Sequence, residues 1–264
     1  MIGLIVKRFR KVLMVLLVGM LLLGNNNVIT AQTVVDDIVE VGTVEELKPW
    51  QIRGYDLVIR IGEWSDGQGN YKPGKRVYLT DEIDWKDIPT SIPINKDERG
   101  HFIHEHDINT LIATRLYEKC KEKGINVTLQ NATNRAEDLN AAGRKSNVNN
   151  PKLYLSVHSN SFNSDSEGYF VIYQDPMGKS IANRLANSIS NNGLIKQQSN
   201  RPNEGSYIGE LNTLHNSTCG VLIETGFYSN LNELKKLVSD EYVDYLAEHM
   251  SDELVKVLND FWSK

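Results

Sequence analysis

Short apolar strands alternate with amphipathic helical segments along most of this chain, and this alternation constrains the fold more than any other feature. The strands that we expect are compact runs rich in Val, Ile and Leu, at residues 125–129, 153–157, 169–173 and 221–223. The helices that we expect lie at residues 105–123, 136–146, 178–191, 232–238 and 242–262. This order predicts an α/β fold with a mixed, mostly parallel sheet and helices on both faces. Ligands of such folds gather at the carboxyl ends of the strands.

The first 31 residues have the build of a secretory signal peptide. Four basic residues at positions 7–11 precede the apolar run Val12–Gly24, and small residues follow at Thr30 and Ala31. The run is shorter than the roughly 20 apolar residues of a membrane span, although an uncleaved N-terminal anchor is the alternative. We therefore expect a secreted or envelope-facing protein, outside the cytoplasmic membrane. Cleavage would change the formal net charge from −5 to about −9.

Residues 32–74 are expected to form a lead-in and a short N-terminal β-hairpin extension. Two strand-like segments, 56–64 and 75–83, flank a turn-rich stretch of Ser, Asp, Gly and Asn, which favours a hairpin. A long loop with two prolines covers residues 89–100. We assign residues 75–264 to one larger domain.

The charge balance disfavours a nucleic-acid partner. The chain has 29 Lys and Arg against 34 Asp and Glu, so the basic excess that phosphate binding needs is absent.

Three residues with metal-binding side chains stand at the edges of the expected elements. His158 and Glu224 each end an apolar strand, and Glu105 begins the helix that runs to Lys123. A histidine and carboxylates that meet at one sheet edge can hold zinc, and a further carboxylate can act as general base. Each residue alone also fits a structural role, for example Glu105 as a charge at a helix start.

The local sequence around these residues resembles a known enzyme family. The stretches Glu105–Asn109, Ser156–Ser161 and Val221–Asn230 look like three ordered motifs of the zinc-dependent N-acetylmuramoyl-L-alanine amidases of the family-3 type, which cleave peptidoglycan. The resemblance runs from about Gly100 to the C-terminus. Three motifs in the right order are more specific than any one of them.

The resemblance implies roles for individual residues. Glu105 and His158 would be zinc ligands, and Glu224 would activate the attacking water and deliver a proton to the departing amine. Asn160 would orient the site or contact the substrate, with capping of the loop as its alternative role. Arg144 matches an arginine on the family's second helix, or is simply a solvated charge.

One ligand of the family is missing here. The family's first strand ends in Gly-His, but no histidine precedes His101 in this chain. Asp84 is our first choice for this ligand, at the end of a strand 76–84 that looks most like the family's first strand. Glu63, which follows Gly62, is the alternative. His101 or His104 is the third choice.

Two functions follow as hypotheses. The first is hydrolysis of the amide between N-acetylmuramic acid and L-alanine by a zinc enzyme. The second is an amidase-like protein with impaired catalysis that binds the cell wall or regulates an envelope partner. An unrelated metallopeptidase lacks support, because the chain contains no His-Glu-x-x-His sequence.

Overall fold

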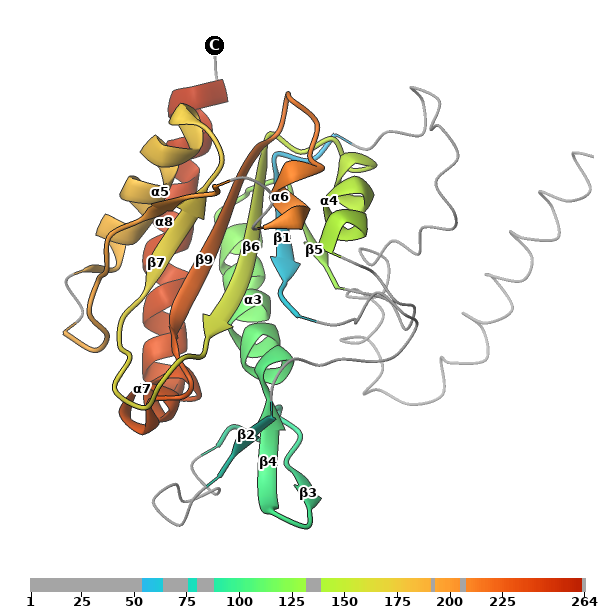
Figure 1. Ribbon diagram of the computed structural model, residues 1–264. Coiled ribbons are helices and arrows are strands. Elements are labelled where there is room, and N and C mark those ends of the chain that lie inside the picture. The colour runs from blue at the N-terminus through green and yellow to red at the C-terminus, as the bar shows by residue number, and fades with distance from the viewer. Residues whose placement is uncertain are drawn as a thin grey trace, which may run out of the picture. The chain divides into compact units, whose positions relative to one another are not determined.

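A mixed six-stranded sheet forms the centre of the protein. The computed structural model describes residues 54–63, 76–79, 88–131, 139–190, 193–204 and 208–262. The strand order is β5-β1-β6-β9-β7-β8 (Figure 1). The strands span Leu57–Ile61 (β1), Val127–Gln130 (β5), Leu153–Asn160 (β6), Phe170–Tyr173 (β7), Arg201–Pro202 (β8) and Cys219–Phe227 (β9).

The sheet is mostly parallel, as expected. β1 pairs in parallel with β5 and β6, β6 with β9, and β7 with β8, whereas β7 and β9 are antiparallel. All five residues of β1, Leu-Val-Ile-Arg-Ile, are buried. A nearly continuous apolar strand of this kind is typical of the middle of a parallel sheet that is covered on both faces.

Helices cover both faces of the sheet (Figure 1). They span Glu105–Glu122 (α3), Leu139–Asn147 (α4), Pro176–Ser188 (α5), Gly209–Asn212 (α6), Leu231–Leu237 (α7) and Asp240–Trp262 (α8). Alternate residues of the strands enter two apolar clusters, because successive side chains of a strand point to opposite faces. Leu57, Leu155 and Ile223 join the large cluster with α3, α5 and α8. Val58, Tyr154 and Leu222 join a smaller cluster that includes Leu211 of α6.

A second, three-stranded sheet precedes α3 and corrects one of our predictions. It contains Arg76–Tyr78 (β2), Asn95–Asp97 (β3) and Gly100–His104 (β4), in the order β2-β4-β3. The predicted hairpin between segments 56–64 and 75–83 is therefore wrong. β1 pairs with two strands of the large sheet, and β2 pairs with β4.

This correction moves the first strand of the large sheet to the earlier segment. The strand that we favoured, 76–84, lies in the second sheet as far as it is described, so β1 takes the place of the first strand. Asp84 itself and the expected signal peptide lie outside the described residues. Among the described helices, none is long and apolar enough to cross a membrane.

Candidate metal centre and active site

His158 and Glu224 lie side by side on neighbouring parallel strands. They are direct partners in the register between β6 and β9. Because side chains alternate along a strand, both belong to the sheet face that also carries Tyr154 and Leu222. The regular pairing is interrupted immediately after His158. Such irregularities are common beside active sites, where they redirect side chains.

Two further carboxylates complete a cluster around His158. Glu63 follows β1, and Glu105 is the first residue of α3, directly after β4. Glu63, Glu105 and His158 each offer one ligand atom, and these atoms all lie within 4.8 Å of one another. Nδ1 of His158 lies 3.8 Å from Oε1 of Glu63 and 3.9 Å from Oε1 of Glu105. The described residues thus include a candidate Glu/Glu/His metal site.

The backbone at Glu63 has an unusual conformation that neighbouring groups maintain. Its φ angle is 58°, in the left-handed region that costs a non-glycine residue about 1–2 kcal/mol. The buried ring of His106 holds this turn, because its Nδ1 lies 3.1 Å and 2.9 Å from the carbonyl oxygens of Gly62 and Glu63. A strained residue fixed in this way is typical of functional sites.

The residue before Glu63 must be small. A Cβ atom on Gly62 would lie 2.5 Å from both Cδ2 and Nε2 of His158. The imidazole ring therefore packs directly against the backbone of the turn that carries Glu63.

Burial shifts the proton affinities of the site. It raises the pKa of Glu224 to about 7, although the nearby His158 opposes this shift. Burial also raises the pKa of Glu63, and the carboxylate of Glu105 adds to the effect. For His158, burial disfavours the charged ring, but the neighbouring carboxylates of Glu105 and Glu210 outweigh it and raise its pKa. A carboxylate with a pKa near neutrality is suited to general acid–base catalysis.

Three residues of this region escaped the sequence analysis. Tyr228 donates a hydrogen bond of 2.9 Å to Oε2 of Glu105 and so fixes that carboxylate. His106 and the fully buried Glu210 are the other two. Tyr228 lies in the Val221–Asn230 motif that we did single out, so its position there was the available signal.

The other described residues that we singled out from the sequence lie outside the Glu/Glu/His group. His104 precedes α3 and faces Asp107, whose carboxylate accepts the backbone N–H of His104. His101 lies on β4 in the second sheet. Neither belongs to the Glu/Glu/His group. Asn160 ends β6, and its side chain accepts the backbone N–H of Ser161, as in the capping alternative. Arg144 is exposed on α4, and its role stays a prediction.

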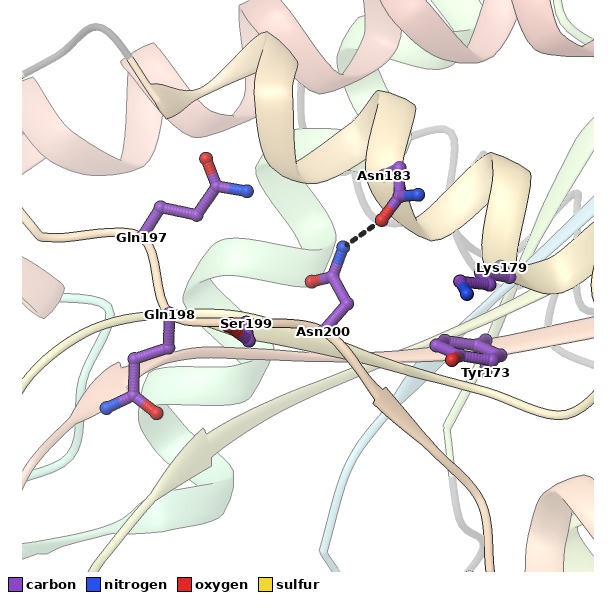
Figure 2. A pocket seen from close by; sticks show the side chains of 7 residues that line it. All are labelled: Tyr173, Lys179, Asn183, Gln197, Gln198, Ser199 and Asn200. Atoms are coloured by element: carbon purple, nitrogen blue, oxygen red, sulfur yellow. Dashed lines mark hydrogen bonds between the residues drawn. The ribbon is translucent and has the colours of Figure 1, made fainter.

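A polar pocket lies elsewhere on the sheet, between α5 and the segment that leads into β8 (Figure 2). It is lined by Tyr173, Lys179, Asn183, Gln197, Gln198, Ser199 and Asn200. Tyr173 pairs with Val221, three residues before Glu224 on β9, which corresponds to roughly 10 Å along the strand. The pocket shares no residue with the Glu/Glu/His group.

Comparison with known families agrees with this geometry. The family model Amidase_3, N-acetylmuramoyl-L-alanine amidase, matches residues 94–256, which include Glu105, His158 and Glu224. The chain belongs to this family. The resemblance inferred from the sequence motifs is thereby confirmed. Glu63 precedes the matched residues, so its place in the site rests on the structure.

Relatives with solved structures share the fold. An N-acetylmuramoyl-L-alanine amidase from Clostridium difficile 630 is 18% identical with a TM-score of 0.60, over 79% of this chain and 99% of that chain. The CwlD amidase from Clostridioides difficile, in complex with the GerS lipoprotein, is 17% identical with a TM-score of 0.53, over 78% of this chain and all of that one (100%).

The uncharacterized protein YqiI of Bacillus subtilis (strain 168) is 26% identical over 149 residues, which are 56% of this chain and 72% of that protein.

Proposed function

We propose that this protein is a zinc-dependent N-acetylmuramoyl-L-alanine amidase that hydrolyses the amide between the lactyl group of N-acetylmuramic acid and L-alanine in peptidoglycan. The observation that carries the proposal is the convergence of Glu63, Glu105 and His158, with Glu224 beside His158 on the next strand. Family membership supports the substrate.

The donor set fits zinc. Catalytic zinc sites have three protein ligands of the nitrogen, oxygen or sulfur type and leave a further position open. One imidazole nitrogen and two carboxylate oxygens meet this requirement, with Glu63 in the place of the family's histidine. Asp84 stays an alternative for this position, since it lies outside the described residues. Zinc, when bound, polarises the scissile carbonyl and the attacking water.

Glu224 is the general base of this proposal. Its Oε2 is buried and has no hydrogen-bond partner among the described residues, so it is free to accept a proton. Glu224 takes a proton from the attacking water and returns it to the amine nitrogen of L-alanine as the amide bond breaks. Tyr228 keeps Oε2 of Glu105 occupied, which leaves Oε1 facing His158.

Hydrolysis of a purified muropeptide tests the proposal. The zinc-loaded protein is expected to release a peptide with a free L-alanine amino terminus, detected by mass spectrometry. Glu224→Gln is expected to lower the rate by about 10² to 10⁴, because the general base is lost. Glu241→Gln removes an exposed carboxylate from α8 and serves as the control with the parent rate. Cleavage at another bond, or an unchanged rate in Glu224→Gln, would count against the proposal.

The absent histidine supports a second candidate, an amidase-like protein with impaired catalysis that binds the wall or serves an envelope partner. The relative CwlD has been solved in complex with a lipoprotein, which supports a partner protein for this chain too. Zinc binding and peptidoglycan binding without any hydrolysis by the isolated protein would favour this candidate over the first.

A further inference from the structure

Glu210 is a fully buried carboxylate next to the candidate metal centre. It lies on α6, the short helix that covers the same sheet face as His158 and Tyr154. The hydroxyl of Tyr154 donates a hydrogen bond of 2.8 Å to Oε2 of Glu210, and Nε of Arg60 lies 3.4 Å from the same oxygen. Its other oxygen, Oε1, lies 3.3 Å from Nε2 of His158.

A contribution to folding stability alone does not explain why Arg60 and Glu210 are buried here as an ion pair. Arg60 is 2% exposed and lies in a strand whose other residues are all apolar. Apolar residues of similar volume are often at least as stable as a buried ion pair, because both charges must leave water. Arg60 balances the charge of Glu210, and its guanidinium also donates a hydrogen bond of 2.6 Å to the carbonyl oxygen of Ile61. The arrangement therefore keeps a negative carboxylate beside His158.

The two ring nitrogens of His158 face different groups. Nδ1 faces the two proposed metal ligands Glu63 and Glu105, whereas Nε2 faces Glu210. A neutral imidazole has a proton on one nitrogen and a free lone pair on the other. An ionised carboxylate can only accept hydrogen bonds, so Glu210 favours the tautomer with the proton on Nε2. The lone pair of Nδ1 is then directed at the metal centre.

Packing against Gly62 also holds the imidazole ring of His158 with Nε2 toward Glu210 and Nδ1 toward the proposed metal ligands. The Cδ2–Nε2 edge of His158 lies against Gly62, where even a methyl group would be 2.5 Å away. Nε2 of His158 and Oε1 of Glu210 are both buried and have no aligned hydrogen bond to any described group, so their contact is electrostatic in this arrangement. The 3.3 Å contact between Nε2 of His158 and Oε1 of Glu210 is thus the ion-pair contact that each of these two atoms makes among the described residues.

We infer that Glu210 is a positioning residue, which fixes the tautomer and orientation of His158 so that Nδ1 is presented to the metal, while Arg60 and Tyr154 hold Glu210 in place. Carboxylates behind metal-bound histidines generally raise metal affinity by 10- to 100-fold. This inference rests on the proposed zinc function, because it assigns His158 as a ligand.

Zinc affinity, measured by competition with a chromophoric chelator, tests the inference. The double variant Arg60→Met/Glu210→Met removes both charges of the buried pair together, so that neither is left unpaired. We expect it to fold, as judged by circular dichroism, and to bind zinc about 10- to 100-fold more weakly than the parent. The matched control Tyr169→Phe removes a buried tyrosine hydrogen bond outside this cluster, the one of 3.0 Å to the carbonyl oxygen of Ala186, and we expect its zinc affinity to stay within about threefold of the parent.

The ¹⁵N signals of the His158 ring provide a readout that a purely structural role would not change. In the parent we expect the proton on Nε2, both with zinc and in the metal-free protein at a pH where the ring is neutral. In the double variant we expect this tautomer preference to be lost. A folded double variant with the affinity of the parent, or a parent with the proton on Nδ1, would overturn the inference.

The same measurements separate this inference from the proposed function. A parent that binds no zinc contradicts the proposed function. In that case the proton on Nε2 in the metal-free parent, and its loss in the double variant, still support the orientation of His158 by Glu210. If the double variant does not fold, Arg60→Leu/Glu210→Leu replaces it, because leucine, like methionine, leaves no acceptor beside Nε2. Unchanged zinc affinity and tautomer in that variant overturn the inference.

Discussion

At the scale of single residues, our proposal depends most on Glu63, which we place where the family resemblance implies a histidine ligand. Glu63 adopts φ 58° and is held there by His106, so the side chain reaches the metal group from a fixed turn. We predict that Glu63→Ala lowers zinc affinity by at least about 100-fold, since two protein ligands are too few for a catalytic zinc site. Glu63→His, which restores a nitrogen ligand, is expected to keep or increase affinity. Equal zinc affinities of Glu63→Ala and the parent would mean that another residue is the third ligand, and Asp84 would be the first to test.

The raised pKa of Glu224 predicts a stability effect in the metal-free protein. Its pKa is about 7, above the ordinary value of 4.5, so the folded state binds the proton more tightly than the unfolded state. The contribution of this residue to stability therefore falls as the pH rises from about 4.5 to 7. We predict that Glu224→Gln, which does not titrate, is more stable than the parent by about 3 kcal/mol at pH 8 and no more stable at pH 4.

Urea unfolding of both metal-free proteins at the two pH values measures this difference. Stabilisation of equal size at pH 4 and pH 8 would mean that the raised pKa is not its cause.

At the scale of elements, the local pattern predicted the type of most helices and strands but not the partners of the first strands. The helices α3, α5, α7 and α8 and the strands β6, β7 and β9 agree with the predicted segments to within a few residues. The hairpin prediction failed because turn residues between two strands do not determine pairing. The uninterrupted apolar run Leu57–Ile61 was the signal for a central parallel strand.

Other parts of the fold and site had weaker signals. β3, with its three polar residues, lies within residues 89–100, for which we predicted a loop. β4 follows it, and its Ile103 is fully buried in the main core. The motifs indicated all three residues, because His158 and Glu224 each end an apolar strand and Glu105 begins a helix. Glu210 gave no local signal, since it belongs to none of the three motifs. Only the packing of α6 on the sheet places it beside His158.

The close packing of Gly62, in the turn after β1, leads to a prediction at the scale of elements. A Cβ atom at position 62 would overlap the ring of His158 and lie 2.5 Å from the carbonyl oxygen of Val157. We predict that Gly62→Ala lowers the free energy of unfolding by about 1–3 kcal/mol and weakens zinc binding by at least about tenfold. Gly54→Ala is the matched control, because a Cβ atom there meets nothing within 4 Å. Zinc titration and thermal unfolding of both variants check this prediction, and parent-like behaviour of Gly62→Ala would contradict the packing described.

At the scale of the whole molecule, the N-terminal segment bears on the compartment in which the protein acts. The basic residues and apolar run of the first 31 residues predict export, and a peptidoglycan substrate outside the cytoplasmic membrane is consistent with it. We predict that alkaline phosphatase fused to the C-terminus is active in a bacterial host, since this reporter folds only after export. Deletion of residues 1–31 should abolish the signal. An active fusion without these residues, or an inactive full-length fusion, would contradict the prediction.

The location of zinc in crystals of the loaded protein tests the central claim most directly. Anomalous diffraction at the zinc absorption edge is expected to give one strong peak, about 2.0–2.2 Å from Nδ1 of His158 and from a carboxylate oxygen of Glu63 and of Glu105. Glu224 should lie next to this peak without binding it. A protein that takes up no zinc, or a peak held by other residues, would contradict the account.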